Sequence, residues 1–288
     1  MRDVAKIMAD FAARPWQAIP EAEMTAGLAV PSMLKPEESR LYHWLGRSVQ
    51  GSGVTVDLGA FAGGSAARLL SGLALSGREY HVHAYDHFRS SRAFWAKYLP
   101  GEPVPDSDDN DILPLATRHL APWAGRVTLH AGDIGKMRWT GGPVDILVVD
   151  AAKGSAMADH IAAEFFAALV PGQSVVVHQD YLLSVQPWLC AQMVALADHF
   201  VPLARVAKDC VAFLCTSVPD AAALAAARTD VLTDGALMKR VREAAGWHEA
   251  MIPRDRFQAM LQRIKDNPGV RLGWQMRHAD RARKQAGD

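Results

Sequence analysis

Short apolar runs alternate with helix-length segments through the middle of the chain. Five such runs begin at Val54, and they read VTVDL, HVHAYD, RVTLHA, VDILVVD and SVVVH. Each run is short enough to be a buried strand. The segments SAARLLSGLAL and DHIAAEFFAAL, which lie between runs, have the length and apolar content of helices. The alternation predicts βαβ units and a doubly wound parallel sheet with helices on both faces.

Two more apolar runs follow a helix-like segment over residues 186–200. They read FVPLARVA and CVAFLCTSV, and only Lys208 and Asp209 separate them. So short a connection predicts an antiparallel hairpin, because parallel strands need a much longer crossover. The predicted fold class is therefore α/β, with five parallel strands and a closing hairpin.

The predicted sheet occupies residues 54–216, and shorter flanks lie on either side of it. Residues 1–53 hold an amphipathic helix at the start and a second helix that begins at Pro36. Residues 217–288 are alanine-rich and then basic; helices are expected to start near Pro219 and Pro253, and the tail is interrupted by Gly235, Gly246 and Pro268-Gly269. Neither flank is long or regular enough for its own core, so we expect an N-terminal helical lid and a C-terminal helical extension.

Composition and charge narrow the class of protein. The chain has 288 residues, with 31 basic and 31 acidic side chains and a formal net charge of zero. A nucleic-acid-binding protein usually carries a basic excess, so a nucleic-acid partner is not expected. The three cysteines suit neither a disulfide framework nor a zinc site. Neither a signal peptide nor a membrane span is recognisable, and we expect a cytoplasmic protein with no membrane partner.

An aspartate stands at the carboxyl end of every predicted parallel strand. One such aspartate is most often the N-cap of the next helix. Five of them, with a glycine-rich loop after the first strand, favour a shared site, since ligands of open α/β sheets bind beyond the carboxyl ends of the strands. The five are Asp57, Asp86, Asp133, Asp150 and Asp180.

The loop after the first strand reads DLGAFAGGS and is not a dinucleotide fingerprint. Phe61 stands where the second glycine of G-x-G-x-x-G would let a pyrophosphate approach. The loop therefore favours a cofactor without phosphates. Asp57 would accept from an ammonium group, Asp86 from the two hydroxyls of a ribose, and Asp133 from the amino group of an adenine.

Over about residues 36–216 the chain resembles the class I S-adenosylmethionine-dependent methyltransferases. DLGAFAGGS is similar to their motif D/E-x-G-x-x-x-G-x-S. The chain is most similar to the macrocin O-methyltransferase group, which methylates sugar or polyketide hydroxyls. The features that carry this likeness are GGS after an aromatic residue, Asp86-His87-Phe88 and the acidic end of the fourth strand. Asp150-Ala151-Ala152-Lys153 is a more distant likeness to catechol O-methyltransferases. The resemblance implies a Rossmann-like sheet of seven strands whose last strand is antiparallel.

The resemblance also implies which residues bind S-adenosylmethionine. The methionine part would be held by Asp57, Gly59, Gly63, Gly64 and Ser65. Asp86 would hold the ribose with Phe88 nearby, and Asp133 and Ile134 would contact the adenine; Asp150 completes the set.

Two departures from the macrocin pattern concern its magnesium ion and its base. The three metal-binding acids of that group correspond here to Asp150, Gln179 and Asp180, and the base corresponds to Ala152. One charge and the base are missing, so we expect metal dependence to be weak or absent, with magnesium kept as an alternative. His178 and Lys153 are the candidate bases, beside Asp150. The alternative interpretations are a core histidine and a surface lysine.

The leading hypothesis is O-methylation of a hydroxyl on a small molecule or glycan. The rivals are a nicotinamide-dependent oxidoreductase and a non-catalytic S-adenosylmethionine-binding regulatory or assembly protein. The segment 24–36 is expected to close over the cofactor. An acidic loop over 106–111 and the aromatic residues Phe94, Trp95 and Tyr98 are candidates for a lid. A homo-oligomer is left open.

Overall fold

The computed structural model describes residues 4–48, 50–103 and 110–277. The predicted acidic loop lies outside these ranges as far as residue 109, and so does the basic end of the chain beyond residue 277. No helix in the described ranges is long and apolar enough to cross a membrane.

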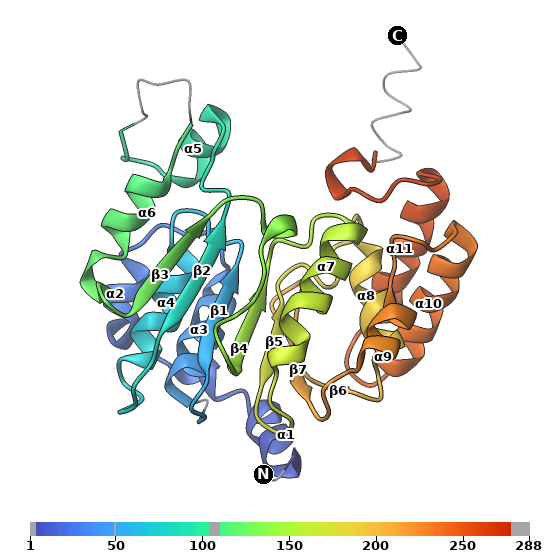
Figure 1. The fold of residues 1–288 in the computed structure, drawn as a ribbon, viewed down its shortest axis with the longest axis horizontal. Coiled ribbons are helices and arrows are strands. Elements are labelled where there is room, and N and C mark those ends of the chain that lie inside the picture. Colours follow the sequence, from blue (N-terminus) through green and yellow to red (C-terminus); the bar gives the residue numbers. More distant parts are fainter. Residues whose placement is uncertain (1–3, 49, 104–109, 278–288) are drawn as a thin grey trace.

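Seven strands form one sheet in the order β3-β2-β1-β4-β5-β7-β6 (Figure 1). β1 to β5 run parallel, and β7 runs antiparallel to both β5 and β6. The order reverses between β1 and β4, the place where open α/β sheets bind ligands. This confirms the predicted Rossmann-like sheet with its antiparallel last strand. The strands are β1 (Val54–Leu58), β2 (Val82–Asp86), β3 (Val127–Ala131), β4 (Val144–Val149), β5 (Val175–His178), β6 (Phe200–Val206) and β7 (Cys210–Cys215).

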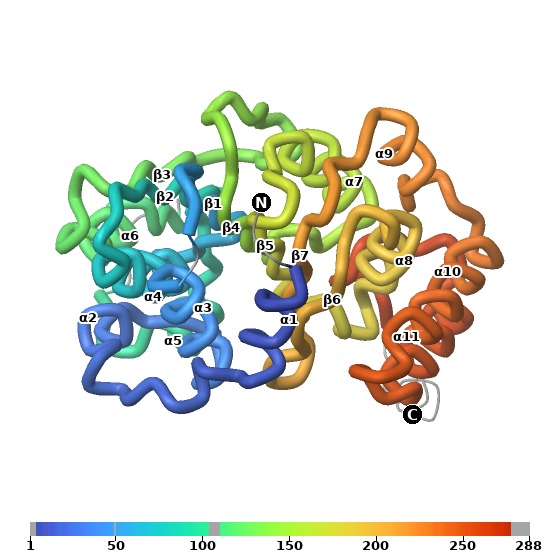
Figure 2. The backbone as a smooth tube through the Cα atoms, turned by 90° about the horizontal axis from the view of Figure 1, so that it is seen from below, coloured from blue at the N-terminus to red at the C-terminus, as the bar shows by residue number. Residues whose placement is uncertain are grey.

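Helices cover both faces of the sheet (Figures 1 and 2). The central strands are buried on both sides, so alternate residues of β4 point into different layers. Ile146 and Val148 pack against the N-terminal helices, whereas Leu147 and Val149 pack against the helices of the second half. The first layer holds α1 (Val4–Ala12), η1 (Pro15–Ala18), η2 (Glu21–Met24), α2 (Thr25–Leu28), α3 (Pro36–Ser48) and α4 (Gly64–Leu73). The second holds α7 (Ser155–Phe165), η5 (Phe166–Ala168), α8 (Pro187–Ala195), α9 (Ala221–Ala227), α10 (Asp234–Trp247) and α11 (Arg254–Asp266).

Shorter elements lie near the carboxyl ends of the strands and between them. β3 and β4 are joined by a single 3₁₀ turn and a loop, where the sequence predicted a helix-length segment. The elements are α5 (Arg92–Tyr98), α6 (Leu113–His119), η3 (Ala121–Trp123), η4 (Ile134–Lys136) and η6 (Gly273–Gln275).

The N-terminal residues pack into the core of the sheet. Trp16, Leu41 and Tyr42 have no solvent exposure and lie in one hydrophobic cluster with Val148 and Val177. Figure 2 shows this segment running along one side of the sheet, with α1 beside β6. Residues before the sheet therefore help to bury one face of β4, β5, β6 and β7 in addition to lying near the site.

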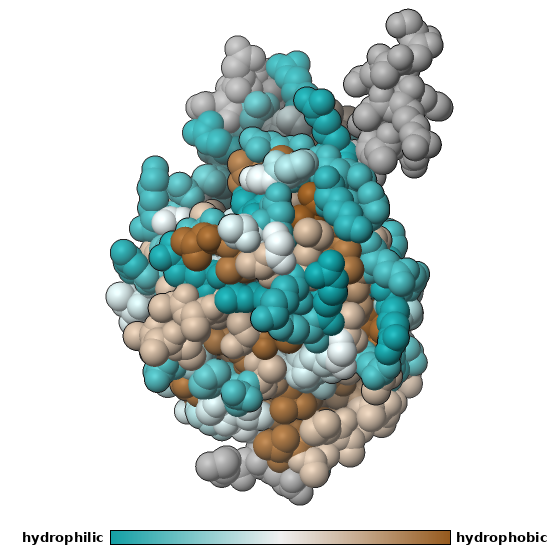
Figure 3. All heavy atoms as spheres, turned by 90° about the vertical axis from the view of Figure 1, so that its right-hand side faces the viewer, coloured by the Kyte–Doolittle hydropathy of each residue, from teal (hydrophilic) through white to brown (hydrophobic). Residues whose placement is uncertain are grey.

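The described part of the C-terminal extension, up to residue 277, holds three α-helices, one more than the sequence predicted. α9 and α11 begin beside Pro219 and Pro253, as expected. The additional helix is α10, and Gly235 and Gly246, which were expected to interrupt this region, lie within its first and last turns. Its apolar residues Leu237, Val241 and Ala244 are buried at helical spacing. Figure 3 views the molecule from the α10 and α11 side, where hydrophilic residues cover much of the surface.

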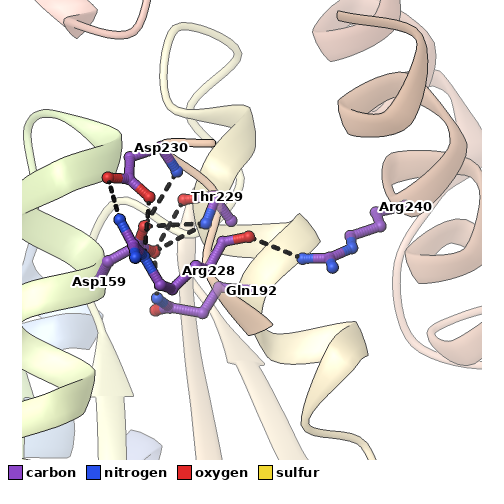
Figure 4. Close-up of polar contacts among 6 residues, drawn as sticks. All are labelled: Asp159, Gln192, Arg228, Thr229, Asp230 and Arg240. Carbon is purple, nitrogen blue, oxygen red and sulfur yellow. Dashed lines mark hydrogen bonds and ion pairs between the residues drawn. The ribbon is translucent and has the colours of Figure 1, made fainter. Parts of the chain in front are cut away.

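A polar cluster ties this extension to α7 (Figure 4). The Asp159 carboxylate accepts from the backbone N–H of Thr229 at 2.8 Å and of Asp230 at 2.9 Å. It also accepts from the Thr229 hydroxyl at 3.0 Å and from Gln192 of α8 at 2.9 Å. One carboxylate thus accepts the hydrogen bonds of two backbone N–H groups and one hydroxyl in the loop that leads from α9 to α10.

Candidate active site

A cavity of about 740 Å³ opens beyond the carboxyl ends of β1, β2 and β4. This is the size range of small-molecule sites. Five of the predicted site residues line it, namely Gly59, Asp86, Ile134, Asp150 and Lys153. A second space of about 20 Å³ adjoins the first and is lined by Gly59, Gly64, Ser65 and Asp150. The other predicted site residues line neither space: they are Asp57, Gly63, Phe88, Asp133, His178, Gln179 and Asp180.

The glycine loop is covered by the segment 30–34. A Cβ atom on Gly64 would lie 2.3 Å from the carbonyl oxygen of Pro31, so only glycine permits this approach. Buried Arg68 of α4 fixes the segment by donating to the carbonyl of Val30 at 2.6 Å. Residues 31–34 line the smaller space together with Gly64 and Ser65. The structure therefore places part of the segment 24–36 against the glycine loop, and its predicted closure over a cofactor stays a prediction.

Asp86 is held by backbone N–H groups on both sides. Its Oδ2 accepts from Phe61 at 2.9 Å and its Oδ1 from Phe88 at 2.7 Å. Both donors have left-handed backbones, with φ of 48° and 50°, which is uncommon for a bulky residue and is typical of functional sites. Burial raises the pKa of Asp86, and the two backbone bonds oppose this shift. Each carboxylate oxygen keeps a further acceptor position, which suits a pair of neighbouring hydroxyls.

Asp57 is fully buried beside the start of α4. Ser65 donates to its Oδ2 at 2.6 Å, whereas Oδ1 accepts no hydrogen bond from the described residues. Burial, reinforced by the charges of Asp150 and Asp86, raises the pKa of Asp57 to about 7 although Ser65 opposes the shift. An unpartnered buried carboxylate oxygen is costly, and a cationic ligand would compensate it.

Asp133 and Ile134 have different surroundings in the structure. Asp133 caps the turn η4 by accepting from Gly135 N–H at 3.0 Å, which is the common role of such an aspartate. Ile134 lines the large cavity and presents an apolar surface to it. Of the two residues predicted to meet an adenine, the structure therefore brings only Ile134 to the cavity.

Lys153 links two of the strand-end aspartates. Its Nζ lies 2.5 Å from Asp150 Oδ1 and 2.5 Å from Asp180 Oδ2, and Gln186 also donates to Asp180 at 2.9 Å. Burial lowers the pKa of Lys153, but the ion pairs outweigh burial and raise it above its ordinary value. Lys153 therefore stays protonated in this arrangement, and the prediction that it is a base is not supported. Burial raises the pKa of Asp150, and Lys153 opposes that shift.

The predicted magnesium ligands do not fit a metal ion. Lys153 bridges Asp150 and Asp180, and the Gln179 side-chain oxygen accepts from the buried hydroxyl of Tyr42 at 2.8 Å. No group of three His, Cys, Asp or Glu side chains in the described ranges is placed to hold a metal. The network around Gln179 includes Tyr42 of α3, which the sequence reasoning did not identify.

The structure places His178 in the hydrophobic core, away from the cavity. Its ring lies among Tyr181 and Phe213, 6.0 Å from each ring centre, and the residue is 1% exposed. Burial lowers the pKa of His178 to about 3, and neither ring nitrogen has a partner among the described residues. The prediction of His178 as the base is therefore corrected to the alternative, a neutral core histidine.

The C-terminal extension supplies one wall of the cavity. Gly154 pairs with Leu272 in an isolated β-bridge. Ser155 N–H donates to the carbonyl of Arg271 at 3.0 Å, and Gly273 N–H donates to the carbonyl of Lys153 at 2.9 Å. These hydrogen bonds position the segment so that Trp274 lines the cavity. No sequence signal marked this segment, because its partners lie more than a hundred residues earlier.

Exposed apolar side chains gather around the cavity. Met33, Phe94 and Trp274 line it and are 42%, 50% and 71% exposed, so half of the six large apolar side chains that are exposed in the described residues lie here. Apolar groups concentrated at one place on a surface mark a binding site. Phe94 was predicted to belong to a lid, whereas Trp95 of the same helix is buried.

Sequence comparison identifies no relative: no protein-family model matches the chain, and no curated protein matches it. Among solved structures the chain is similar to the O-methyltransferase NovP, with a TM-score of 0.49 and 15% identity over 65% of this chain and 82% of that one. It is also similar to the SAH-bound methyltransferase PaMTH1 of Podospora anserina, with a TM-score of 0.44 and 13% identity over 75% and 89% of the two chains. These likenesses are too weak to carry a conclusion about activity.

Proposed function

We propose that the protein is an S-adenosylmethionine-dependent methyltransferase that methylates a hydroxyl group of a small molecule or glycan. The observation that carries the proposal is the pair of acids at the ends of neighbouring strands. Asp86 is fixed by Phe61 of the glycine loop, and Asp57, next to the same loop, has a buried oxygen that accepts no hydrogen bond from the described residues. One acid suits a ribose and the other an ammonium group, and the two acids stand on the adjacent parallel strands β1 and β2, where a nucleoside with an amino-acid tail could reach both.

The chain's own residues would hold the methyl donor in three places. Asp86 would accept from the ribose hydroxyls, and Ile134 would contact the adenine from the cavity wall. Asp57, with Ser65, would bind the amino group of the methionine part. The smaller space measures only about 20 Å³, so segment 30–34 would have to move away from the glycine loop for the donor to fit. In this arrangement segment 30–34 would cover the donor, in line with the lid predicted for the N-terminal segment.

Transfer to a hydroxyl needs alignment and the removal of one proton. The acceptor oxygen forms a bond to the methyl carbon as the carbon–sulfur bond breaks, and holding the reactants in line supplies most of the rate gain. The hydroxyl proton would pass to the Asp150 carboxylate, whose raised pKa makes it a better base than an ordinary aspartate. Asp150 lines both spaces, so it lies where donor and acceptor would meet.

The mouth of the cavity favours an acceptor with an apolar face. Phe94 and Trp274 offer aromatic surfaces, and Met33 offers a flexible apolar one. Aromatic rings of this kind pack against flat polyketide-like molecules and against the apolar faces of sugars. The acceptor class is therefore a small molecule or glycan with such a face.

Titration calorimetry with S-adenosylmethionine and with S-adenosylhomocysteine tests the proposal. We expect one donor molecule to bind per chain and Asp86→Ala to abolish binding, with Asp133→Ala as the matched control that keeps it. Formation of S-adenosylhomocysteine with a panel of hydroxylated acceptors then tests catalysis. Absence of binding by the unmodified protein would overturn the proposal, and binding without turnover on any acceptor would favour the non-catalytic alternative.

A nicotinamide-dependent oxidoreductase is disfavoured by the conformation of Phe61. Its bulky side chain occupies a position where a pyrophosphate needs glycine, and its N–H is already bonded to Asp86. Fluorescence of NADH in the presence of the protein tests this alternative directly. The cytoplasmic location and the absence of nucleic-acid partners stay predictions from the sequence, which left a homo-oligomer open.

A further inference from the structure

The ammonium group of Lys153 lies between the two carboxylates that the resemblance assigns to a magnesium ion. Its Nζ is 2.5 Å from an oxygen of Asp150 and 2.5 Å from an oxygen of Asp180. These contacts are charge-assisted hydrogen bonds of short length, the strong kind. A cation of the protein itself therefore already occupies the position between the two acids.

The third predicted ligand is also engaged elsewhere. The side-chain oxygen of Gln179 accepts a hydrogen bond from the Tyr42 hydroxyl at 2.8 Å, and Tyr42 of α3 is fully buried. Gln179 also carries no charge, so the site holds two negative charges and one positive charge from Lys153. Divalent cations prefer several oxygen ligands, and each of the three residues already has a partner here: Lys153 contacts one oxygen of Asp150 and one of Asp180, and Tyr42 donates to Gln179.

Lys153 is also positioned to meet a ligand. Its side chain is 41% exposed and lines the large cavity next to Asp150. An ammonium group has three N–H donors, and two of them are used by the carboxylates. Its backbone is fixed as well, because the carbonyl of Lys153 accepts from Gly273 N–H at 2.9 Å.

We propose that Lys153 is the resident cation of this site, and that its third N–H binds the acceptor oxygen during methyl transfer in place of a divalent metal. The inference rests on the proposed function. The acceptor hydroxyl loses its proton to Asp150, its oxygen forms the bond to the methyl carbon, and the electron pair of the broken carbon–sulfur bond stays on sulfur. Lys153 keeps its proton throughout and stabilises the developing negative charge on the oxygen.

Binding of Mn²⁺, followed by electron paramagnetic resonance, tests the cation without any need for activity. We expect Lys153→Ala to bind Mn²⁺ at least about tenfold more tightly than the unmodified protein, because it leaves two carboxylates without their cation. The double variant Lys153→Ala with Asp180→Asn is the matched control and should lose this binding. Equal Mn²⁺ binding by the unmodified protein and Lys153→Ala, including none by either, overturns the proposal.

Kinetics of Lys153→Met and Lys153→Arg test its role on the acceptor. Lys153→Met should lower kcat by at least about tenfold while its affinity for S-adenosylmethionine stays within about threefold, and Lys153→Arg should recover part of the rate. Full activity of Lys153→Met, or activity of the unmodified protein that EDTA abolishes and magnesium restores, overturns the proposal. Failure of the unmodified protein to bind the methyl donor would instead overturn the proposed function, and the Mn²⁺ comparison would still decide the cation.

Discussion

The backbone N–H of Phe61 donates to Asp86 Oδ2 at 2.9 Å, so the residue that ends β2 fixes the glycine loop that follows β1. Asp86→Asn keeps the size of the side chain but removes its charge. We expect the affinity for S-adenosylmethionine to fall by about 10- to 100-fold, the value of one or two hydrogen bonds to a charged group. Calorimetry measures the change, and an unchanged affinity would show that Asp86 acts on the loop alone.

Asp57→Asn should stabilise the protein and weaken donor binding. The folded-state pKa of Asp57 is raised from 3.8 to about 7, so folding favours its protonated form and stability falls as the pH rises from about 4 to 7. At pH 8 the variant should therefore be more stable, by at most about 4 kcal/mol, and at pH 4 it should match the unmodified protein. Urea unfolding at the two pH values measures this difference.

The same carboxyl predicts the pH dependence of donor binding. An ammonium group pairs only with ionised Asp57, so the affinity for S-adenosylmethionine should fall by about tenfold per pH unit below pH 7. Calorimetry between pH 5.5 and 8 follows the trend. A flat profile for the unmodified protein would show that Asp57 does not meet the amino group.

Asp159→Ala should destabilise the protein through the C-terminal extension. It removes the acceptor of the Thr229 and Asp230 N–H groups and of Gln192, and it leaves these donors unsatisfied (Figure 4). We expect a loss of about 2–4 kcal/mol in urea unfolding. Arg228→Ala is the control from the same cluster, because its exposed ion pair with Asp230 contributes little. Equal effects of the two variants would contradict this account.

His178→Leu should keep methyl transfer within about threefold, because a group that does not reach the cavity contributes no proton transfer. Both ring nitrogens are buried and have no hydrogen-bond partner within residues 4–48, 50–103 and 110–277, so an apolar side chain of similar volume should also leave stability unchanged or raise it. Thermal unfolding and the initial rate are the two measurements. A loss of rate by a hundredfold with an intact fold would restore His178 as the base.

Trp274→Ala should raise KM for the acceptor and leave the affinity for S-adenosylmethionine unchanged. The side chain is 71% exposed at the cavity, so its removal costs the fold little and removes only ligand contact. Leu75→Ala is the matched control, since Leu75 is 53% exposed and lies outside the cavity lining. An unchanged KM would place the acceptor elsewhere.

The sequence predicted the fold well because strand period and loop chemistry are local. Runs such as VDILVVD are buried on both faces, and the two residues Lys208 and Asp209 permit only a hairpin. The additional helix α10 depended on tertiary packing, because burial of its apolar face outweighs the local preference of Gly235 and Gly246.

The site was predicted only as far as strand ends reveal it. Asp86 and Asp150 lie at the cavity because their strands end there, whereas Gln179 and Lys153 have partners that the sequence does not disclose. Burial turned His178 from a candidate base into a neutral core residue. Trp274 had no signal, because the bridge between Gly154 and Leu272 is a long-range contact.

That bridge has a consequence for the order of events during synthesis. All seven strands and both acids of the donor site are translated by residue 215, and the wall made by residues 271–274 is translated only after them. A chain still on the ribosome can fold its sheet domain first, since domains fold as they emerge. The acceptor wall can therefore form only after residue 274 has been synthesised, so a nascent chain that ends before this segment has no complete acceptor site even when its donor site is formed.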